Sequence, residues 1–104
     1  MTSSAPEGTG ATSEMHLCLF VAGEEANSRQ ARENLERLCR EYLDGCVRVE
    51  VVDVLKDFRA AVAERVLVTP ALVVKAPPPR VVVLGNLSDT ARVLAALGLA
   101  GRTR

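Results

Sequence analysis

Aromatic side chains are scarce in this chain of 104 residues, which has two phenylalanines, one tyrosine and no tryptophan. A platform that binds single-stranded nucleic acid by stacking needs exposed aromatic rings, so such a platform is not expected. The chain also lacks an excess of positive charge, because thirteen Lys and Arg residues are balanced by thirteen Asp and Glu residues. Binding to nucleic acid or to an anionic membrane by electrostatics alone is therefore disfavoured.

Long hydrophobic runs are missing as well. No stretch approaches the roughly 18 apolar residues that a membrane-spanning helix requires, so we expect a soluble, cytoplasmic protein without a membrane partner. Residues 1–14 are rich in Ser, Thr, Gly and Ala and are expected to form a disordered tail. The length then leaves residues 15–100 for a single α/β domain and residues 101–104 for a flexible C-terminus.

The three cysteines, Cys18, Cys39 and Cys46, form no C-x-x-C pair and have no pair of histidines beside them. A disulfide framework and a zinc site are therefore not expected, and we interpret all three as reduced, at least partly buried thiols. His16 is the only histidine and has no evident acid beside it, which disfavours Ser/His or Cys/His catalysis. We expect no catalytic residue, no cofactor and no metal.

The first half of the chain predicts a strand, a helix and a second strand. Residues 16–22 are apolar on both alternating faces, as in a central strand that is covered on both sides. Asn27 and Ser28 are the expected N-caps of the helix, which should end at residues 44–45. Residues 47–52 alternate between valine and charge before turning wholly apolar, which predicts a second strand entering the core. The expected buried helix face consists of Ala31, Leu35, Leu38 and Tyr42.

The second half predicts a short helix over residues 57–66, two antiparallel strands over 71–75 and 80–84, and a final helix. Prolines 77–79 form a stiff connector between the two strands. Ser88 is the expected N-cap of the final helix, with Asp89 in its first turn, and the helix ends before Gly98. The expected apolar faces are Phe58, Ala61, Val62 and Val66 in the first helix, and Ala91, Leu94 and Leu97 in the last. The complete order, β-α-β-α-β-β-α, resembles the thioredoxin fold.

An oxidoreductase with that fold needs a reactive cysteine at the start of its first helix and a second cysteine three residues later. The corresponding residues 23–28 contain no cysteine, and Glu24 and Glu25 would oppose formation of a thiolate. Cys18 and Cys39 occupy positions typical of packing. We therefore expect a binding domain that is not an enzyme, with a thiol–disulfide oxidoreductase as the disfavoured alternative.

Several short motifs over residues 17–99 resemble the KaiB family of small proteins from bacterial circadian clocks and related modules. They are LFVAG at 19–23 with Asn27 and Ser28, VVDVLK at 51–56, VTPAL at 68–72, PPP at 77–79 and GNLS at 85–88. The resemblance implies a non-enzymatic regulatory protein that binds a hexameric KaiC-type ATPase and, in cyanobacteria, sequesters KaiA and displaces the histidine kinase SasA. The alternative is a thioredoxin-like sensory or scaffold domain that partners a histidine kinase, as in SasA.

The resemblance also implies fold switching between a tetrameric ground state, in which the C-terminal half is rearranged, and a monomeric thioredoxin-like state that binds KaiC. Cyanobacterial members usually have Gly and Asp where this chain has Ala96 and Gly98, and residues 90–97 favour a helix. We therefore expect the thioredoxin-like state to predominate. By analogy with the thioredoxin fold, Pro70 is a candidate cis-proline. The candidate switch residues are Pro70, Pro77, Pro78, Pro79, Ala96 and Gly98.

Two regions are the candidate partner-binding sites. Arg65 keeps the basic character of a family docking position, and together with the turn at Thr69 and Pro70 it is expected to contact the ATPase. Arg48 and Glu50 lie on the second predicted strand. Glu50 stands where cyanobacterial members usually have Lys, and Val82 stands where they have Arg. A reversed charge can abolish docking of the original partner, so a KaiA-type or kinase partner is doubtful.

Overall fold

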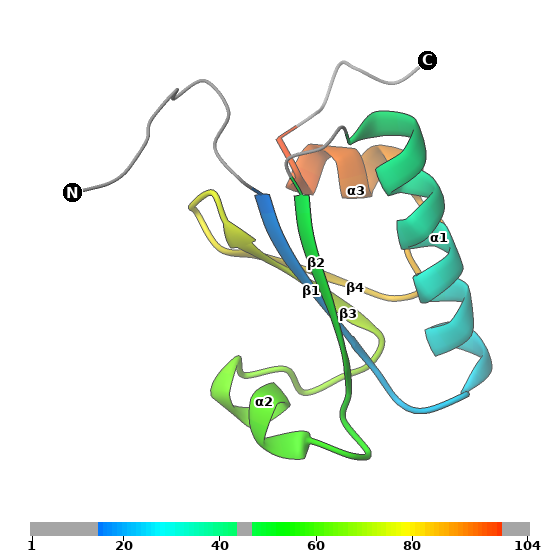
Figure 1. The fold of residues 1–104 in the computed structure, drawn as a ribbon, viewed down its shortest axis with the longest axis vertical. Helices are drawn as coiled ribbons and strands as arrows, with labels where there is room; N and C mark the ends of the chain where they lie inside the picture. Colours follow the sequence, from blue (N-terminus) through cyan, green and yellow to red (C-terminus); the bar gives the residue numbers. More distant parts are fainter. Residues whose placement is uncertain (1–14, 44–46, 99–104) are drawn as a thin grey trace.

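The computed structural model describes residues 15–43 and 47–98 (Figure 1). Its elements follow the predicted β-α-β-α-β-β-α order. The N-terminal tail expected over 1–14, the helix end expected at 44–45 and the C-terminus expected over 101–104 lie outside the described residues. Within them, no helix is long and apolar enough to cross a membrane. The elements are β1 (Met15–Val21), α1 (Ala26–Tyr42), β2 (Val47–Asp53), α2 (Phe58–Ala63), β3 (Ala71–Ala76), β4 (Val81–Leu84) and α3 (Thr90–Ala96).

The four strands form one sheet in the order β2-β1-β3-β4. β1 pairs parallel with β2 and antiparallel with β3, and β4 pairs antiparallel with β3. The predicted central position of the first strand is confirmed, because residues 17–21 are all buried. Helix α1 connects β1 to β2 as a parallel crossover, so the C-terminal ends of both strands lie at the same end of the sheet.

Helices α1 and α3 cover one face of the sheet, and α2 lies against the other (Figure 1). The core under α1 and α3 is the larger, and it includes Leu17, Leu38, Leu72 and Leu94. The core under α2 contains four buried residues, namely Cys18, Phe20, Ala61 and Val73. The second face of the sheet is therefore only partly covered.

Helix α1 buries the predicted side chains Ala31, Leu35 and Leu38. The predicted N-cap is wrong, because Glu25 occupies that position and its carboxylate accepts a hydrogen bond from the N–H of Ser28 at 3.1 Å. The N–H group of the third helical residue is one of those that a shorter N-cap side chain usually bonds, and the longer glutamate side chain reaches it as well. Ser28 instead lies inside the first turn and is completely buried.

Strand β2 does not enter the core as predicted but forms an edge of the sheet. Val49 and Val51 are 41% and 50% exposed, because no strand among the described residues lies beyond them. Helix α2 is shorter than predicted and buries only Ala61, whereas Phe58 and Val62 are each 66% exposed. Both errors have one origin, since an apolar pattern does not distinguish a core-facing surface from an exposed one.

The last helix also differs in detail from its prediction. Asp89, rather than Ser88, is the N-cap, and its carboxylate accepts a hydrogen bond from the N–H of Arg92 at 3.1 Å. Ala91 is exposed, while Leu94 faces the core as expected. Gly98 has a φ of +78°, a left-handed conformation that ends the helix where the sequence predicted. The buried residues of this segment are Val93, Leu94 and Leu97.

A cluster of three charges joins the end of α2 to the hairpin of β3 and β4. Glu64 lies 3.3 Å from Nζ of Lys75 and 3.3 Å from Nε of Arg80, and the Arg80 guanidinium also donates to the Glu64 carbonyl oxygen. Burial alone would raise the pKa of Glu64, but hydrogen bonds and charge from Lys75 and Arg80 outweigh it and hold that pKa below its usual value. The ionised carboxylate therefore stabilises this arrangement.

We expect Glu64→Gln to lower the free energy of unfolding by about 0.5–1 kcal/mol at pH 7, as for partly exposed ion pairs. Because the folded-state pKa is lowered, this stabilisation is present above the unfolded-chain value of about 4.3 and is lost as the pH falls through the folded-state pKa. Urea unfolding at neutral and acidic pH measures both effects. The control is Glu36→Gln, which removes a more exposed pair 3.9 Å long; equal stability of Glu64→Gln and the wild type at pH 7 would contradict the prediction.

Candidate functional site

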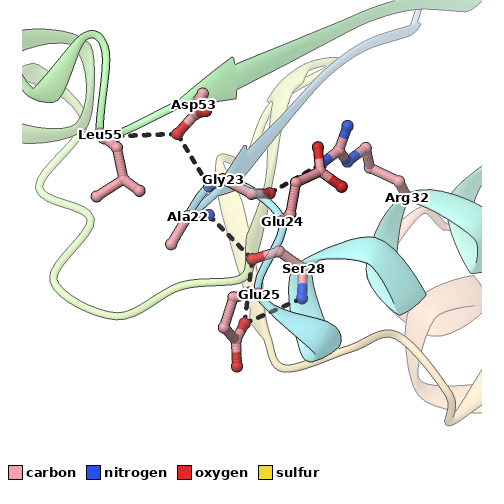
Figure 2. Close-up of polar contacts among 8 residues, drawn as sticks. All are labelled: Ala22, Gly23, Glu24, Glu25, Ser28, Arg32, Asp53 and Leu55. Atoms are coloured by element: carbon pink, nitrogen blue, oxygen red, sulfur yellow. Dashed lines mark hydrogen bonds and ion pairs between the residues drawn. The ribbon is translucent and has the colours of Figure 1, made fainter.

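The turn between β1 and α1 is the place where an oxidoreductase with this fold would carry its thiols. Here Oδ1 of Asp53 accepts hydrogen bonds from the N–H groups of Gly23 and Leu55, both at 3.0 Å (Figure 2). These two bonds, from Leu55 first and Gly23 second, hold the pKa of Asp53 below its usual value. Gly23 has a φ of +55°, and an added Cβ would lie 3.1 Å from Leu55, so the turn requires glycine.

The second half of this turn is closed in the same way. The buried Ser28 hydroxyl accepts a hydrogen bond from the N–H of Ala22 at 2.9 Å and lies 3.3 Å from Glu25 (Figure 2). Arg32 donates to the carbonyl oxygen of Gly23 at 2.9 Å and pairs with Glu24 at 3.5 Å. The polar groups that an active site would direct at a substrate are therefore engaged with one another.

The described cysteines lie away from this turn. Burial, with a smaller contribution from Glu50, raises the pKa of Cys18 to about 11. Burial also raises the pKa of Cys39, with Glu36 adding to the effect. Cys46 lies outside the described residues. Both described thiols thus stay protonated at neutral pH, whereas redox catalysis requires a thiolate.

His16 has an acidic neighbour that the sequence analysis missed. Its Nε2 atom lies 3.3 Å from Oε1 of Glu50. The parallel pairing of β1 and β2 places His16 opposite Arg48, which is two residues before Glu50 on the same face of the sheet. Only the strand register reveals this contact. In the described residues, no three His, Cys, Asp or Glu side chains gather as metal ligands.

The largest exposed apolar side chains surround helix α2. Leu67 is 93% exposed, and Phe58 and Val62 occupy one side of the helix at a spacing of four residues. We call this set the α2 surface. It consists of Leu55, Phe58, Val62, Leu67 and Val68.

Arg65 lies within the same segment and ends helix α2. Its N–H donates to the carbonyl of Val62 at 3.0 Å, and the N–H of Val66 donates to the carbonyl of Ala61 at 2.9 Å. This pair of bonds is a Schellman motif, in which the residue at the position of Arg65 adopts a left-handed conformation. Arg65 has a φ of +61° and an exposed side chain. The helix end therefore fixes where this cation emerges.

Thr69 and Pro70 follow Arg65 along the chain. The Thr69–Pro70 peptide bond is cis, as predicted. Thr69 is half-buried and Pro70 is buried, so Pro70 offers little surface to a partner. A hollow of about 350 Å³ lies between this loop and β4. It is lined by Arg65, Val66, Leu67, Val68, Val82 and Leu84.

The other two partner-binding candidates are not part of that surface. Arg48 and Glu50 are exposed on β2, at the opposite edge of the sheet from β4. The structure therefore separates the candidates into one group beside α2 and β4 and a second group on β2.

Most of the candidate switch residues lie together. Pro77, Pro78, Pro79, Ala96 and Gly98 all line a single hollow of about 450 Å³ between the β3–β4 hairpin and the end of α3. Pro70 lies apart, in the loop before β3. The sequence could not show this grouping, since the prolines and Ala96 are some twenty residues apart.

Solved structures share this arrangement. The N-terminal domain of Synechococcus elongatus SasA superimposes with a TM-score of 0.71 at 22% identity and covers 97% of both chains. Mitochondrial thioredoxin 3 from Saccharomyces cerevisiae gives a TM-score of 0.67 at 20% identity, over 83% of this chain and 79% of that one. At such identities the likeness shows the fold alone, and the predicted thioredoxin-like fold is confirmed.

Sequence comparison establishes the family. The KaiB domain model matches residues 18–99. The circadian clock protein KaiB3 of Synechocystis sp. is 37% identical over 83 residues, which are 80% of this chain and 81% of that protein. The circadian clock oscillator protein KaiB of Nostoc punctiforme is 39% identical over 80% of both chains. The match to the family model covers β1 from Cys18 onward and every later strand and helix, and this chain is therefore a member of the KaiB family.

Proposed function

We propose that this protein acts in the cytoplasm as a non-enzymatic regulatory module, in a circadian clock or a related signalling system, by docking on a KaiC-type hexameric ATPase. The observation that carries the proposal is the α2 surface on a chain of the KaiB family. All five of its members are more than half exposed although each is apolar, and Leu67 is exposed the most. Exposed apolar side chains gathered on one surface are typical of protein interaction sites.

The closed structure of the β1–α1 turn supports the same proposal. The turn is closed by its own hydrogen bonds, through Asp53, Ser28 and Glu25. The raised pKa of Cys18 leaves its thiol unreactive at neutral pH. These features favour a role in binding over a role in catalysis.

Docking at the α2 surface combines two kinds of contact. Phe58 and Leu67 supply apolar area, and burial of one such side chain contributes about 1.5–3 kcal/mol. Arg65 supplies a charge at the edge of the same surface and is held there by the backbone of the helix end. Phenylalanine and arginine are enriched in protein interfaces, and arginine is among the residues that often contribute most to the binding energy.

We further propose that the thioredoxin-like arrangement is the principal state of this chain. Ala96 ends α3, where alanine favours a helix over glycine by about 1 kcal/mol. Gly98 adopts a φ of +78°, which an aspartate would adopt only with strain. The two residues that differ from cyanobacterial members therefore both stabilise this end of the helix.

Arg65→Glu should weaken binding to a KaiC-type hexamer at least about tenfold, because an anion replaces the fixed cation at the proposed interface. Gel filtration with the hexamer in ATP and in ADP measures comigration. Arg65→Asn keeps a residue that tolerates the left-handed backbone and should give a smaller loss. Arg29→Glu changes an exposed residue of α1 outside the α2 surface. It is the control and should bind normally. If the wild type fails to comigrate in every nucleotide state, the docking proposal is wrong.

The state of the C-terminal half is measured by backbone NMR chemical shifts. We expect helical shifts over residues 90–96 and extended shifts over 81–84. The double variant Ala96→Gly/Gly98→Asp removes both stabilising features of α3 and should reduce the helical signals or add a second set. Extended shifts over 90–96 in the wild type would contradict the proposed principal state.

A third measurement tests the absence of thiol chemistry. In the variant Cys39→Ser/Cys46→Ser, only Cys18 remains, and with a pKa of about 11 only about one thiol in a thousand is ionised at pH 8. A thiol reagent should therefore react at least about tenfold more slowly with the folded protein than with the urea-unfolded one. Equal rates, or turnover in an insulin reduction assay by the wild type, would favour the oxidoreductase alternative.

A further inference from the structure

Strand β2 is an outer edge of the sheet that the described residues form. The N–H of Val54 donates to the carbonyl oxygen of Val21 at 2.8 Å, so even-numbered residues of this strand direct their backbone groups toward β1. Backbone groups alternate along a strand, and those of Val47, Val49 and Val51 therefore point away from the sheet. No strand among the described residues pairs with them. Such an edge is a ready template for another strand.

The side chains of β2 have a pattern that is complementary to itself. Val49 and Val51 line the hollow under α1 and are about half exposed, whereas Arg48 and Glu50 are exposed on the opposite face. Valines lie symmetrically about Val49, at positions 47 and 51. The two residues that flank Val49, Arg48 and Glu50, carry opposite charges. Charges on an edge strand normally prevent pairing, but this order of signs favours one particular pairing.

We propose that two copies of this protein associate through antiparallel pairing of their β2 edges, with Val49 on the two-fold axis. Arg48 of each copy then faces Glu50 of the other, so the interface contains two Arg–Glu pairs. Val47 of each copy faces Val51 of the other on the α1 side. The result is one continuous sheet across both copies, with an isologous interface of the kind that closes a dimer.

Both the backbone and the charges select this register. With Val49 on the axis, the outward backbone groups of residues 47, 49 and 51 form the hydrogen-bonded pairs. Arg48 and Glu50 then occupy the non-hydrogen-bonded pairs, where facing side chains are closest. An axis at Arg48 or at Glu50 would set two identical charges directly opposite each other. An axis at Val51 would set Glu50 against Val52, so that Arg48 of one copy would not face Glu50 of the other.

This contact is separate from the proposed ATPase surface. Arg65 and the hollow beside it lie at β4, across the sheet from β2. The resemblance to KaiB implies a monomer for the thioredoxin-like state, and the β2 edge argues instead for a dimer in this chain. Because dimerisation is tested with the protein alone, its failure would leave the ATPase proposal unaffected.

Sedimentation equilibrium of the full chain, from about 10 μM to 1 mM, measures the association, since a seven-residue edge forms a small interface of modest affinity. We expect a monomer–dimer equilibrium. Arg48→Glu sets four carboxylates together, and Glu50→Arg sets four guanidinium groups together, so each should raise the dissociation constant at least about tenfold. The double variant Arg48→Glu/Glu50→Arg restores opposite charges and should recover dimerisation. Far-UV circular dichroism checks that each variant is folded.

Mixing the two single variants provides a sharper test. One copy then carries two glutamates and the other two arginines at positions 48 and 50, so the mixture should form a heterodimer although each variant alone is monomeric. A wild type that stays monomeric at 1 mM overturns the proposal. So does a dimer that both single variants leave unchanged, because that dimer must use another surface.

Discussion

The burial of β1 on both faces is the constraint on which the remaining structure depends. Residues 17–21 are enclosed by α1 and α3 on one side and by the core under α2 on the other. β1 is also the strand that pairs with both β2 and β3. Since each face of β1 needs its own apolar cover, the chain must cross over the sheet with α1 and then supply α2 to the opposite face. The unequal size of the two covers leaves large side chains near α2 exposed.

The order of the elements could be predicted from the sequence because it depends on local patterns. The apolar run at 16–22, the spacing of Leu35 and Leu38, and the left-handed stop at Gly98 each act within a few residues. Apart from the two misplaced N-caps, the errors arose where a residue's role depends on a distant segment. Val51 is as apolar as a core residue, but it is exposed because no strand within residues 15–43 and 47–98 lies beyond β2. The contact of His16 with Glu50 likewise requires the register of β1 against β2.

The same distinction applies to the candidate site. The lack of cysteine in the β1–α1 turn was visible in the sequence, whereas the engagement of Asp53 with Gly23 and Leu55 was not, because these residues are up to thirty positions apart. The family resemblance pointed to Arg65. Only the backbone shows that Arg65 is the left-handed residue of a Schellman motif, since the usual sequence signal for that position is glycine.

If Arg65 docks on a partner, as proposed, an arginine at that position is a compromise between folding and recognition. A left-handed backbone costs a residue with a side chain about 1–2 kcal/mol that glycine would avoid. Glycine, however, would end the helix with no side chain to present. With Arg65 the chain gives up some stability and obtains a cation. The backbone that carries it is held by the hydrogen bonds of the Schellman motif. Selection for stability alone would therefore replace Arg65 by glycine, and the selected protein would be more stable but would lose the cation of the proposed docking surface.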